Sequence, residues 1–171
     1  MDKYFEGKVA VVTGAAGVIC SEVSKDLASL GCFVVLVDLS LENAEKVAEE
    51  IRANGGKCKA YSCNVMDKAM VDALADEVIK NHGRCDFLIN GAGGNNPRAT
   101  TDKEYFEIGD IDADTKSFFD LDADGVGFVF NLNFLGTLIP TQAFTRQMTG
   151  REGCNIINIS SMNAYTPLTK I

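Results

Sequence analysis

The stretch KVAVVTGAAGVICSEVSKDLASLG, residues 8–31, decides the fold. It opens with a short apolar run that ends at Thr13 beside a glycine, which is typical of a strand buried on both faces. From Val18 to Leu30 the apolar residues recur near helical spacing, and a glycine then provides a typical helix stop. A buried strand, a glycine turn and a helix in this order predict the first unit of a parallel α/β sheet.

The same alternation continues along the chain. We expect strands at 33–37, 57–63, 85–90 and 154–159, and helices at 41–53, 67–81 and 123–148, the last one kinked near Pro140. Right-handed crossovers between parallel strands then favour a Rossmann-like, doubly wound α/β sheet with strand order 3-2-1-4-5. Since the chain stops twelve residues after the fifth strand, we expect one domain, 1–171, that lacks its C-terminal strands.

The regular alternation is interrupted between residues 91 and 120 by a long, polar and acidic segment. A loop of this length in a compact domain is usually functional. It follows the carboxyl end of the fourth strand, the edge where open α/β sheets bind ligands. We therefore interpret residues 94–121 as an insert on the substrate side.

Composition excludes several classes of function. The chain has 171 residues, with 24 acidic and 16 basic side chains and a net charge of -8, which argues against a nucleic-acid groove. No apolar run is long enough to span a membrane, and no signal peptide precedes the first strand, so we expect a cytoplasmic protein without a membrane partner. Six cysteines without paired spacing and a single histidine predict reduced thiols and no metal site.

The glycine turn and an acidic residue downstream predict a dinucleotide site. Small residues at Gly14 and Gly17 allow backbone N–H groups to approach a pyrophosphate at a helix N-terminus. Asp38 ends the second strand 24 residues after Gly14, where a carboxylate can accept both hydroxyl hydrogens of an adenosine ribose. It would repel a 2′-phosphate, so NAD is expected rather than NADP, although an aspartate here could instead cap a helix.

Six short motifs, spread almost from end to end, resemble the short-chain dehydrogenase/reductase family. They are Thr13-Gly14-x-x-Gly17, Asp38, Asn64-Val65, Asn90-Gly91-Ala92-Gly93, Asn133-Phe-Leu-Gly136 and Asn158-Ile-Ser160-Ser161. The chain further resembles one branch of this family, the D-mannonate oxidoreductase (fructuronate reductase) type. This resemblance rests on the residue sequences of Asn90–Gly94, Phe118–Asp122 and Asn131–Thr137. The resemblance implies hydride transfer between a nicotinamide and a sugar acid, in a homo-oligomer.

The resemblance also implies roles for individual residues. Ser161 would hydrogen-bond the reacting oxygen, and Asn133 would help to hold a water relay. The cofactor would lie against Gly14, Gly17, Val18, Ile19, Asp38, Asn64, Val65, Asn90, Gly91, Ala92 and Gly93. Candidate substrate residues are Asn95, Arg98, which could pair with a carboxylate, and Asn163.

Several positions depart from the family pattern. Val18 and Cys20 stand where glycines are usual, and Asn64 replaces an aspartate. The Gly14-x-x-Gly17 spacing also resembles an extended, epimerase-like branch, but the later motifs favour the compact one.

The family's Tyr-x-x-x-Lys pair is not found where the resemblance requires it. Tyr165 and Lys170 are five residues apart with a proline between them, so they do not form the pair. We expect the pair beyond Ile171, and we expect this chain alone to bind cofactor without turnover.

Two other functions stay open from the sequence. The chain could be a nucleotide-binding protein without catalytic activity. It could also be an acidic interaction module, because Asp120, Asp122 and Asp124 imitate the start of a calcium-binding loop. These carboxylates could equally cap the helix that follows them.

Overall fold

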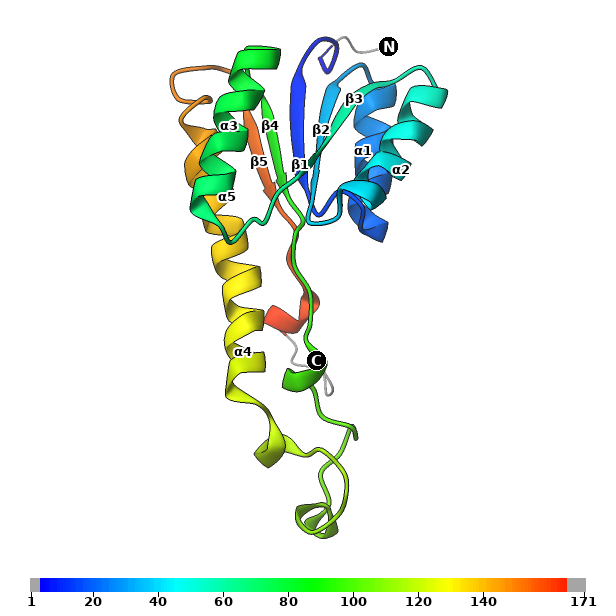
Figure 1. The fold of residues 1–171 in the computed structure, drawn as a ribbon, viewed down its shortest axis with the longest axis vertical. Coiled ribbons are helices and arrows are strands. Elements are labelled where there is room, and N and C mark those ends of the chain that lie inside the picture. The colour runs from blue at the N-terminus through cyan, green and yellow to red at the C-terminus, as the bar shows by residue number, and fades with distance from the viewer. Residues whose placement is uncertain (1–3, 166–171) are drawn as a thin grey trace.

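The computed structural model describes residues 4–165 and contains one five-stranded parallel sheet in the order β3-β2-β1-β4-β5, as predicted (Figure 1). Helices α1 and α2 cover one face of the sheet, and α3 and α5 cover the other. The strands are β1 (Val9–Thr13), β2 (Phe33–Asp38), β3 (Lys57–Ser62), β4 (Phe87–Asn90) and β5 (Asn155–Asn158), and the helices are α1 (Val18–Ser29), α2 (Leu41–Ala53), α3 (Lys68–His82), α4 (Ala123–Phe130) and α5 (Gly136–Thr145).

The core consists of two apolar clusters, one on each face of the sheet. Successive residues of a strand point to opposite faces, so Val9 and Val11 of β1 join the cluster under α3 and α5, whereas Ala10 and Val12 join the cluster under α1 and α2. All five β1 residues are buried. This two-sided burial explains why the central strands are continuous apolar runs and do not alternate with polar residues.

The long helix predicted for 123–148 is interrupted near its middle. It continues through Pro140, and a π-helical turn, Asn131–Leu135, separates α4 from α5. Proline cannot donate to the carbonyl four residues before it and also crowds that carbonyl, which here belongs to Gly136. The wider turn lies directly before Gly136, so the irregularity expected near Pro140 takes the form of a π-helical turn.

The insert 94–121 projects beyond the carboxyl edge of the sheet, beside α4 (Figure 1). Its carboxylates satisfy local backbone groups: Asp122 accepts the N–H groups of Asp124 (2.8 Å) and Gly125 (3.0 Å), and Asp120 accepts the N–H of Ser117 (2.9 Å). This is helix capping, the alternative to a calcium loop. Within residues 4–165 no group of three His, Cys, Asp or Glu side chains is arranged to hold a metal.

None of the helices in the described part of the chain is long and apolar enough to cross a membrane. The six cysteines are free thiols, and four of them are buried, as expected. Burial raises the pKa of Cys85 to about 12 and that of Cys63 to about 11, so both thiols stay protonated and unreactive at neutral pH.

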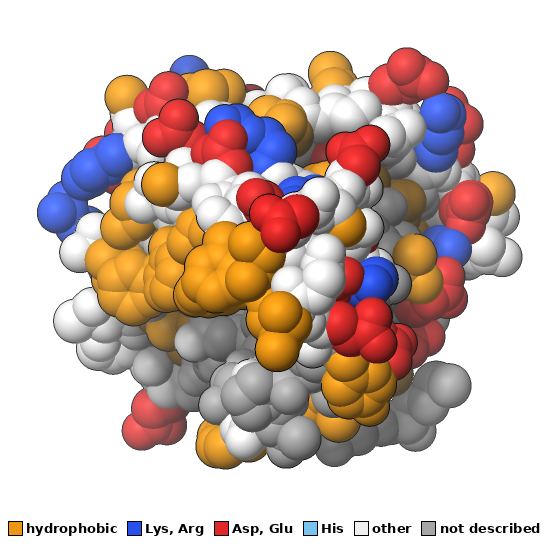
Figure 2. Space-filling view, turned by 90° about the horizontal axis from the view of Figure 1, so that it is seen from below, with side chains coloured by type: hydrophobic (Ala, Val, Ile, Leu, Met, Phe, Trp, Pro, Cys, Tyr) orange, Lys and Arg blue, Asp and Glu red, His pale blue; other side chains and the backbone are white. Residues whose placement is uncertain are grey.

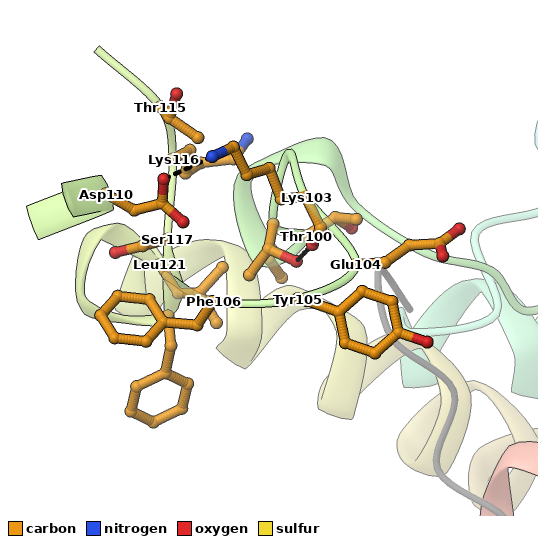
Figure 3. A pocket seen from close by; sticks show the side chains of 13 residues that line it. Thr100, Lys103, Glu104, Tyr105, Phe106, Asp110, Thr115, Lys116, Ser117 and Leu121 are labelled. Atoms are coloured by element: carbon orange, nitrogen blue, oxygen red, sulfur yellow. Dashed lines mark hydrogen bonds and ion pairs between the residues drawn. The ribbon is translucent and has the colours of Figure 1, made fainter. Parts of the chain in front are cut away.

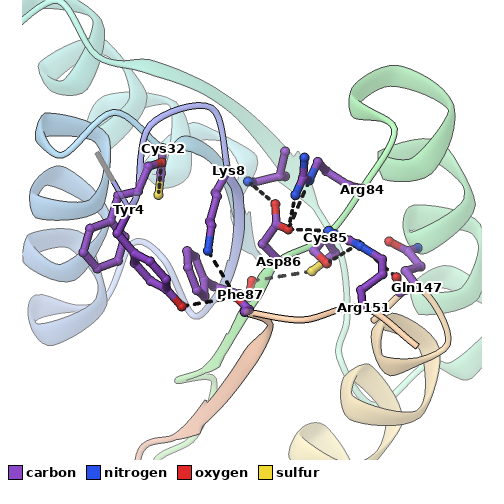
Figure 4. Close-up of polar contacts among 12 residues, drawn as sticks. Tyr4, Lys8, Cys32, Arg84, Cys85, Asp86, Phe87, Gln147 and Arg151 are labelled. Atoms are coloured by element: carbon purple, nitrogen blue, oxygen red, sulfur yellow. Dashed lines mark hydrogen bonds and ion pairs between the residues drawn. The ribbon is translucent and has the colours of Figure 1, made fainter. Parts of the chain in front are cut away.

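Asp86 connects three segments at the amino edge of the sheet (Figure 4). Its carboxylate, 1% exposed, accepts the N–H of Val9 (2.9 Å), both Nε (3.0 Å) and Nη2 (2.8 Å) of Arg84, and Nη2 of Arg151. Burial alone would raise the pKa of Asp86, but the hydrogen bonds from Arg84 and Val9 hold it below its usual value. The ionised form of Asp86 therefore stabilises the fold.

We predict that Asp86→Asn lowers the free energy of unfolding at pH 7 by about 3 kcal/mol, because the arginines lose their buried counter-charge. Since the folded-state pKa lies below the unfolded value of about 3.9, this stabilisation is complete above that pH. It disappears as pH falls through the folded-state pKa. Urea unfolding of both proteins between pH 7 and pH 3 measures this. A difference that did not shrink in acid would contradict the assignment.

Candidate functional site

Two glycine-containing turns meet at the carboxyl edge of the sheet, where strand order reverses between β1 and β4. Gly14 follows β1 with a φ of 64°. A Cβ atom on Gly14 would lie 2.9 Å from the backbone of Gly91 and Ala92, which follow β4. Only a glycine permits both this backbone conformation and this approach. The two turns thus lie against each other at the place where open α/β sheets bind ligands.

Thr13 joins these turns; the glycine motif of the sequence includes it, but no role in the site was predicted for it. Its side chain, 1% exposed, accepts the N–H groups of Gly91 (3.1 Å) and Ala92 (3.2 Å) through Oγ1. The sequence signal that could have identified Thr13 is its place as a polar residue at the end of an otherwise apolar strand.

The cysteine that departs from the family pattern fits this junction. A Cβ on Gly91 would lie only 2.0 Å from the Cys20 Sγ, so the thiol occupies the space that a side chain at 91 would need. Burial raises the pKa of Cys20, as does the neighbouring Asp38 carboxylate, so this thiol is packing and not a nucleophile. The cysteine at position 20 is therefore accommodated because position 91 is a glycine and has no side chain.

The N-terminus of α1 presents free backbone donors. Its N-cap is Gly17, which makes no side-chain cap hydrogen bond. The two residues that follow it are apolar yet open: Val18 is 87% exposed and Ile19 is 62% exposed. Uncapped N–H groups at a helix N-terminus suit a pyrophosphate. The exposed apolar pair beside them suits the ring of a bound cofactor.

Asp38 binds the glycine turn and does not cap α2. Its Oδ2 accepts the N–H of Ala16 (3.1 Å), and its Oδ1 accepts the N–H of Ser40 (3.0 Å). The cap of α2 is Ser40, whose hydroxyl accepts the N–H of Asn43 (3.3 Å). A carboxylate has about four acceptor positions, so Asp38 keeps capacity for the two hydroxyl groups of a ribose.

Asn64 and Asn90 make local structural contacts at the same edge. Asn64 Oδ1 accepts the N–H of Met66 (3.1 Å). Val65 is buried, and its side chain lies 3.0 Å from where a Cβ on Gly136 would be. Asn90 Nδ2 donates to Thr141 Oγ1 and to Asn158 Oδ1, both at 2.9 Å, and so connects β4 with α5 and β5. Their contact with a cofactor stays a prediction.

Asn133, on the π-helical turn, holds the backbone of the turn after β4. Its Oδ1 accepts the N–H of Gly94 (3.1 Å), and its Nδ2 donates to the carbonyl oxygen of Gly94 (2.9 Å) and to that of Val129 (2.8 Å). A Cβ on Gly93 would lie 2.6 Å from Asn133 Oδ1. The side chain of Asn133 therefore holds the backbone of Gly94 in place. Its part in a water relay remains a prediction.

The other candidate site residues lie at the same edge. Ser161 follows β5, is exposed, and accepts the N–H of Asn163 (3.2 Å), which leaves its hydroxyl proton free. The Arg98 guanidinium instead contacts the Asp122 Oδ2, with Nη2 at 2.6 Å and Nε at 3.1 Å, so its charge is already balanced. Asn95 is exposed, and Asn163 is half-buried.

A Tyr-x-x-x-Lys spacing does occur at Tyr4 and Lys8, but in the wrong place. Lys8 directly precedes β1, so the pair lies at the amino edge of the sheet (Figure 4). The five residues of β1, about 16 Å, separate it from the glycine turn. Tyr165 is 91% exposed, and Lys170 lies outside the described residues.

These features define a dinucleotide-binding α/β domain whose site lies at the carboxyl edge of β1, β2 and β4. Residues 8–171 match the short chain dehydrogenase family, and the chain belongs to that family. An uncharacterised oxidoreductase from Haemophilus influenzae is 53% identical over 166 residues, which are 97% of this chain and 58% of that protein.

Two solved structures share the fold. A candidate D-mannonate oxidoreductase from Haemophilus influenzae with bound NAD has a TM-score of 0.93 and 53% identity, over 97% of this chain and 59% of that one. An NAD⁺-bound xylitol dehydrogenase has a TM-score of 0.82 and 29% identity, over 97% and 58%. The chain thus spans about three fifths of the length of these relatives.

The close approach at Gly14 gives a test of the site. We predict that Gly14→Ala lowers the free energy of unfolding by about 3 kcal/mol, because left-handed backbone strain and a backbone clash add together. Gly55→Ala is the matched control, since Gly55 also has a positive φ (80°) but nothing within 4 Å of the added Cβ. It should cost only about 1 kcal/mol. If urea unfolding showed the same loss of free energy for Gly14→Ala and Gly55→Ala, the close approach to Ala92 would not contribute to stability.

Proposed function

We propose that this chain is the cofactor-binding part of an NAD-dependent oxidoreductase that transfers a hydride between the nicotinamide and a sugar acid such as D-mannonate or D-fructuronate. The observation that carries the proposal is the Asp38 carboxylate, which is bonded to the glycine turn and has acceptor positions left for a ribose. Support for NAD and for the substrate class comes from the 53% identical structure, described as a candidate D-mannonate oxidoreductase and holding NAD.

Each part of the edge has a role in this proposal. The open N–H groups after Gly17 bind the pyrophosphate, and Asp38 binds the adenosine ribose and disfavours a 2′-phosphate. Val18 and Ile19 would keep water away from the nicotinamide ring, and hydride transfer is the chemistry that this group would supply when bound. The Ser161 hydroxyl donates to the ketone oxygen in reduction and accepts from the alcohol in oxidation.

The proton donor of this reaction is proposed to be a tyrosine with a lysine four residues later, in residues that follow Ile171. None of the four tyrosines in this chain forms such a pair beside Ser161 among the described residues. Extending the reading frame past Ile171 tests this. A Tyr-x-x-x-Lys helix supports the oxidoreductase, and its absence from a complete gene favours a nucleotide-binding protein without turnover.

Cofactor choice gives a sharper test. Asp38→Ala should weaken NAD binding about 10- to 100-fold, because hydrogen bonds to a charged group contribute about 1.5–3 kcal/mol. The same variant should gain affinity for NADP, since the repulsion of the 2′-phosphate is removed. Isothermal titration calorimetry with both cofactors measures these changes. Asp76→Ala removes an exposed carboxylate from α3 and serves as the control.

The two alternatives give different results in this titration. A nucleotide-binding protein without activity would show the same Asp38 effect and no turnover in its complete form. An acidic interaction module would bind neither cofactor in either variant.

Association of several subunits is also proposed. Phe130 and Phe134, on α4 and the π-helical turn, are 71% and 65% exposed. Figure 2 shows a patch of hydrophobic side chains on the face seen from below. Apolar surface of this kind is typical of protein–protein contacts. Light scattering of the complete protein tests this.

A further inference from the structure

Among the described residues, Lys116 is the cation of the insert whose side chain forms no ion pair. Arg98 pairs with Asp122 at 2.6 Å, and Lys103 pairs with Asp110 at 2.6 Å and Glu107 at 3.2 Å. Within residues 4–165, Lys116 has no carboxylate oxygen within 4.0 Å of its Nζ. Lys116 is half-buried.

The position of Lys116 is fixed by its surroundings. Its backbone N–H donates to the Asp102 carboxylate (2.8 Å), and its carbonyl oxygen accepts the N–H of Asp102 (2.9 Å). Its Nζ donates to the carbonyl oxygen of Pro97 (2.6 Å). An ammonium group has three donors, so two remain for a ligand.

Lys116 lines two neighbouring cavities of the insert. One has a volume of about 290 Å³ and is shown in Figure 3, where Lys116 and Lys103 lie on one side and the aromatic rings of Tyr105 and Phe106 on the other. The second, more open cavity has a volume of about 430 Å³. Asn95, Pro97, Thr100, Thr101, Asp102 and Lys116 line it.

The donors left in the second cavity suit an anion. The hydroxyl groups of Thr100 and Thr101 donate to backbone carbonyl oxygens, each at 3.0 Å. The amide of Asn95 makes no hydrogen bond among the described residues, so its N–H₂ is free together with the two N–H groups of Lys116. A carboxylate accepts only, and an ammonium and an amide are suitable donors for it.

This second cavity begins next to the cofactor turn, residues 91–94 after β4. Asn95 directly follows Gly94, whose N–H and carbonyl oxygen are both bonded to Asn133. A substrate whose reacting carbon lies at the carboxyl edge of the sheet would therefore extend toward the insert.

We propose that Lys116, assisted by the amide of Asn95, binds the carboxylate of the sugar-acid substrate and sets the preference for acids over neutral sugars. This rests on the proposed function and assigns to Lys116 the role that the sequence suggested for Arg98. Asp102 lowers the affinity of the cavity for an anion, because its carboxylate lies in the same wall.

The test uses the enzyme in its complete form, including any residues encoded after Ile171. Lys116→Met should raise KM for D-fructuronate at least 10-fold with little change in kcat. It should leave KM for D-fructose, which has a hydroxymethyl group in place of the carboxylate, within twofold. Lys116→Arg should restore most of the preference, and Asp102→Asn should lower KM for the acid about twofold. Lys103→Met is the control, because Lys103 is already paired.

Calorimetric binding of D-mannonate to the NAD complex separates this inference from the proposed function. If the protein reduces fructuronate and Lys116→Met leaves KM unchanged, or raises it equally for the neutral sugar, the role of Lys116 is overturned. If mannonate binds, Lys116→Met weakens binding at least 10-fold and no turnover occurs, the carboxylate site stands and the reaction is wrong. If the complete protein neither binds nor reduces a sugar acid, both proposals are overturned.

Discussion

The structure depends on how closely two backbone turns approach at the point where the order of the parallel strands reverses. A side chain on Gly14 would meet the backbone of Gly91 and Ala92 at 2.9 Å, and the Thr13 hydroxyl accepts both N–H groups of that turn. Because β1 and β4 are adjacent and parallel, their turns leave the sheet at the same edge. The packing of this junction thus fixes where the N-terminus of α1 points and where the insert begins.

The two edges of the sheet use their carboxylates differently. At the amino edge Asp86 is almost fully buried, and donors from Val9, Arg84 and Arg151 surround it. At the carboxyl edge Asp38 accepts two backbone N–H groups only and is half-buried. A fully bonded, buried carboxylate stabilises the fold, whereas one with free acceptor positions at a ligand-binding edge is available for recognition.

The sequence predicted all five strands of the sheet and their order. The strands and helices around Asp38 follow from apolar runs, helical spacing and glycine stops, and the strand order is that of the doubly wound fold that this alternation indicates. The π-helical form of the turn at 131–135 was not predicted, because a proline identifies the hydrogen bond that is lost but not how the helix adjusts to the loss. The partners of Arg98 and Lys116 were not predictable, since ion pairs across a loop depend on tertiary contacts that local patterns do not encode.

Asn133 shows why the insert and the cofactor turn have to be considered together. The π-helical turn that carries Asn133 lies between α4, which begins at the end of the insert, and α5, which packs on the sheet. Its side chain bonds to both backbone groups of Gly94, the residue at the start of the insert. The start of the insert is therefore held by Asn133 at Gly94, and Arg98 in the insert pairs with Asp122, the residue directly after its end. A loop fixed in this way can carry a binding residue at a defined distance from the cofactor turn, which an unrestrained loop of the same length could not.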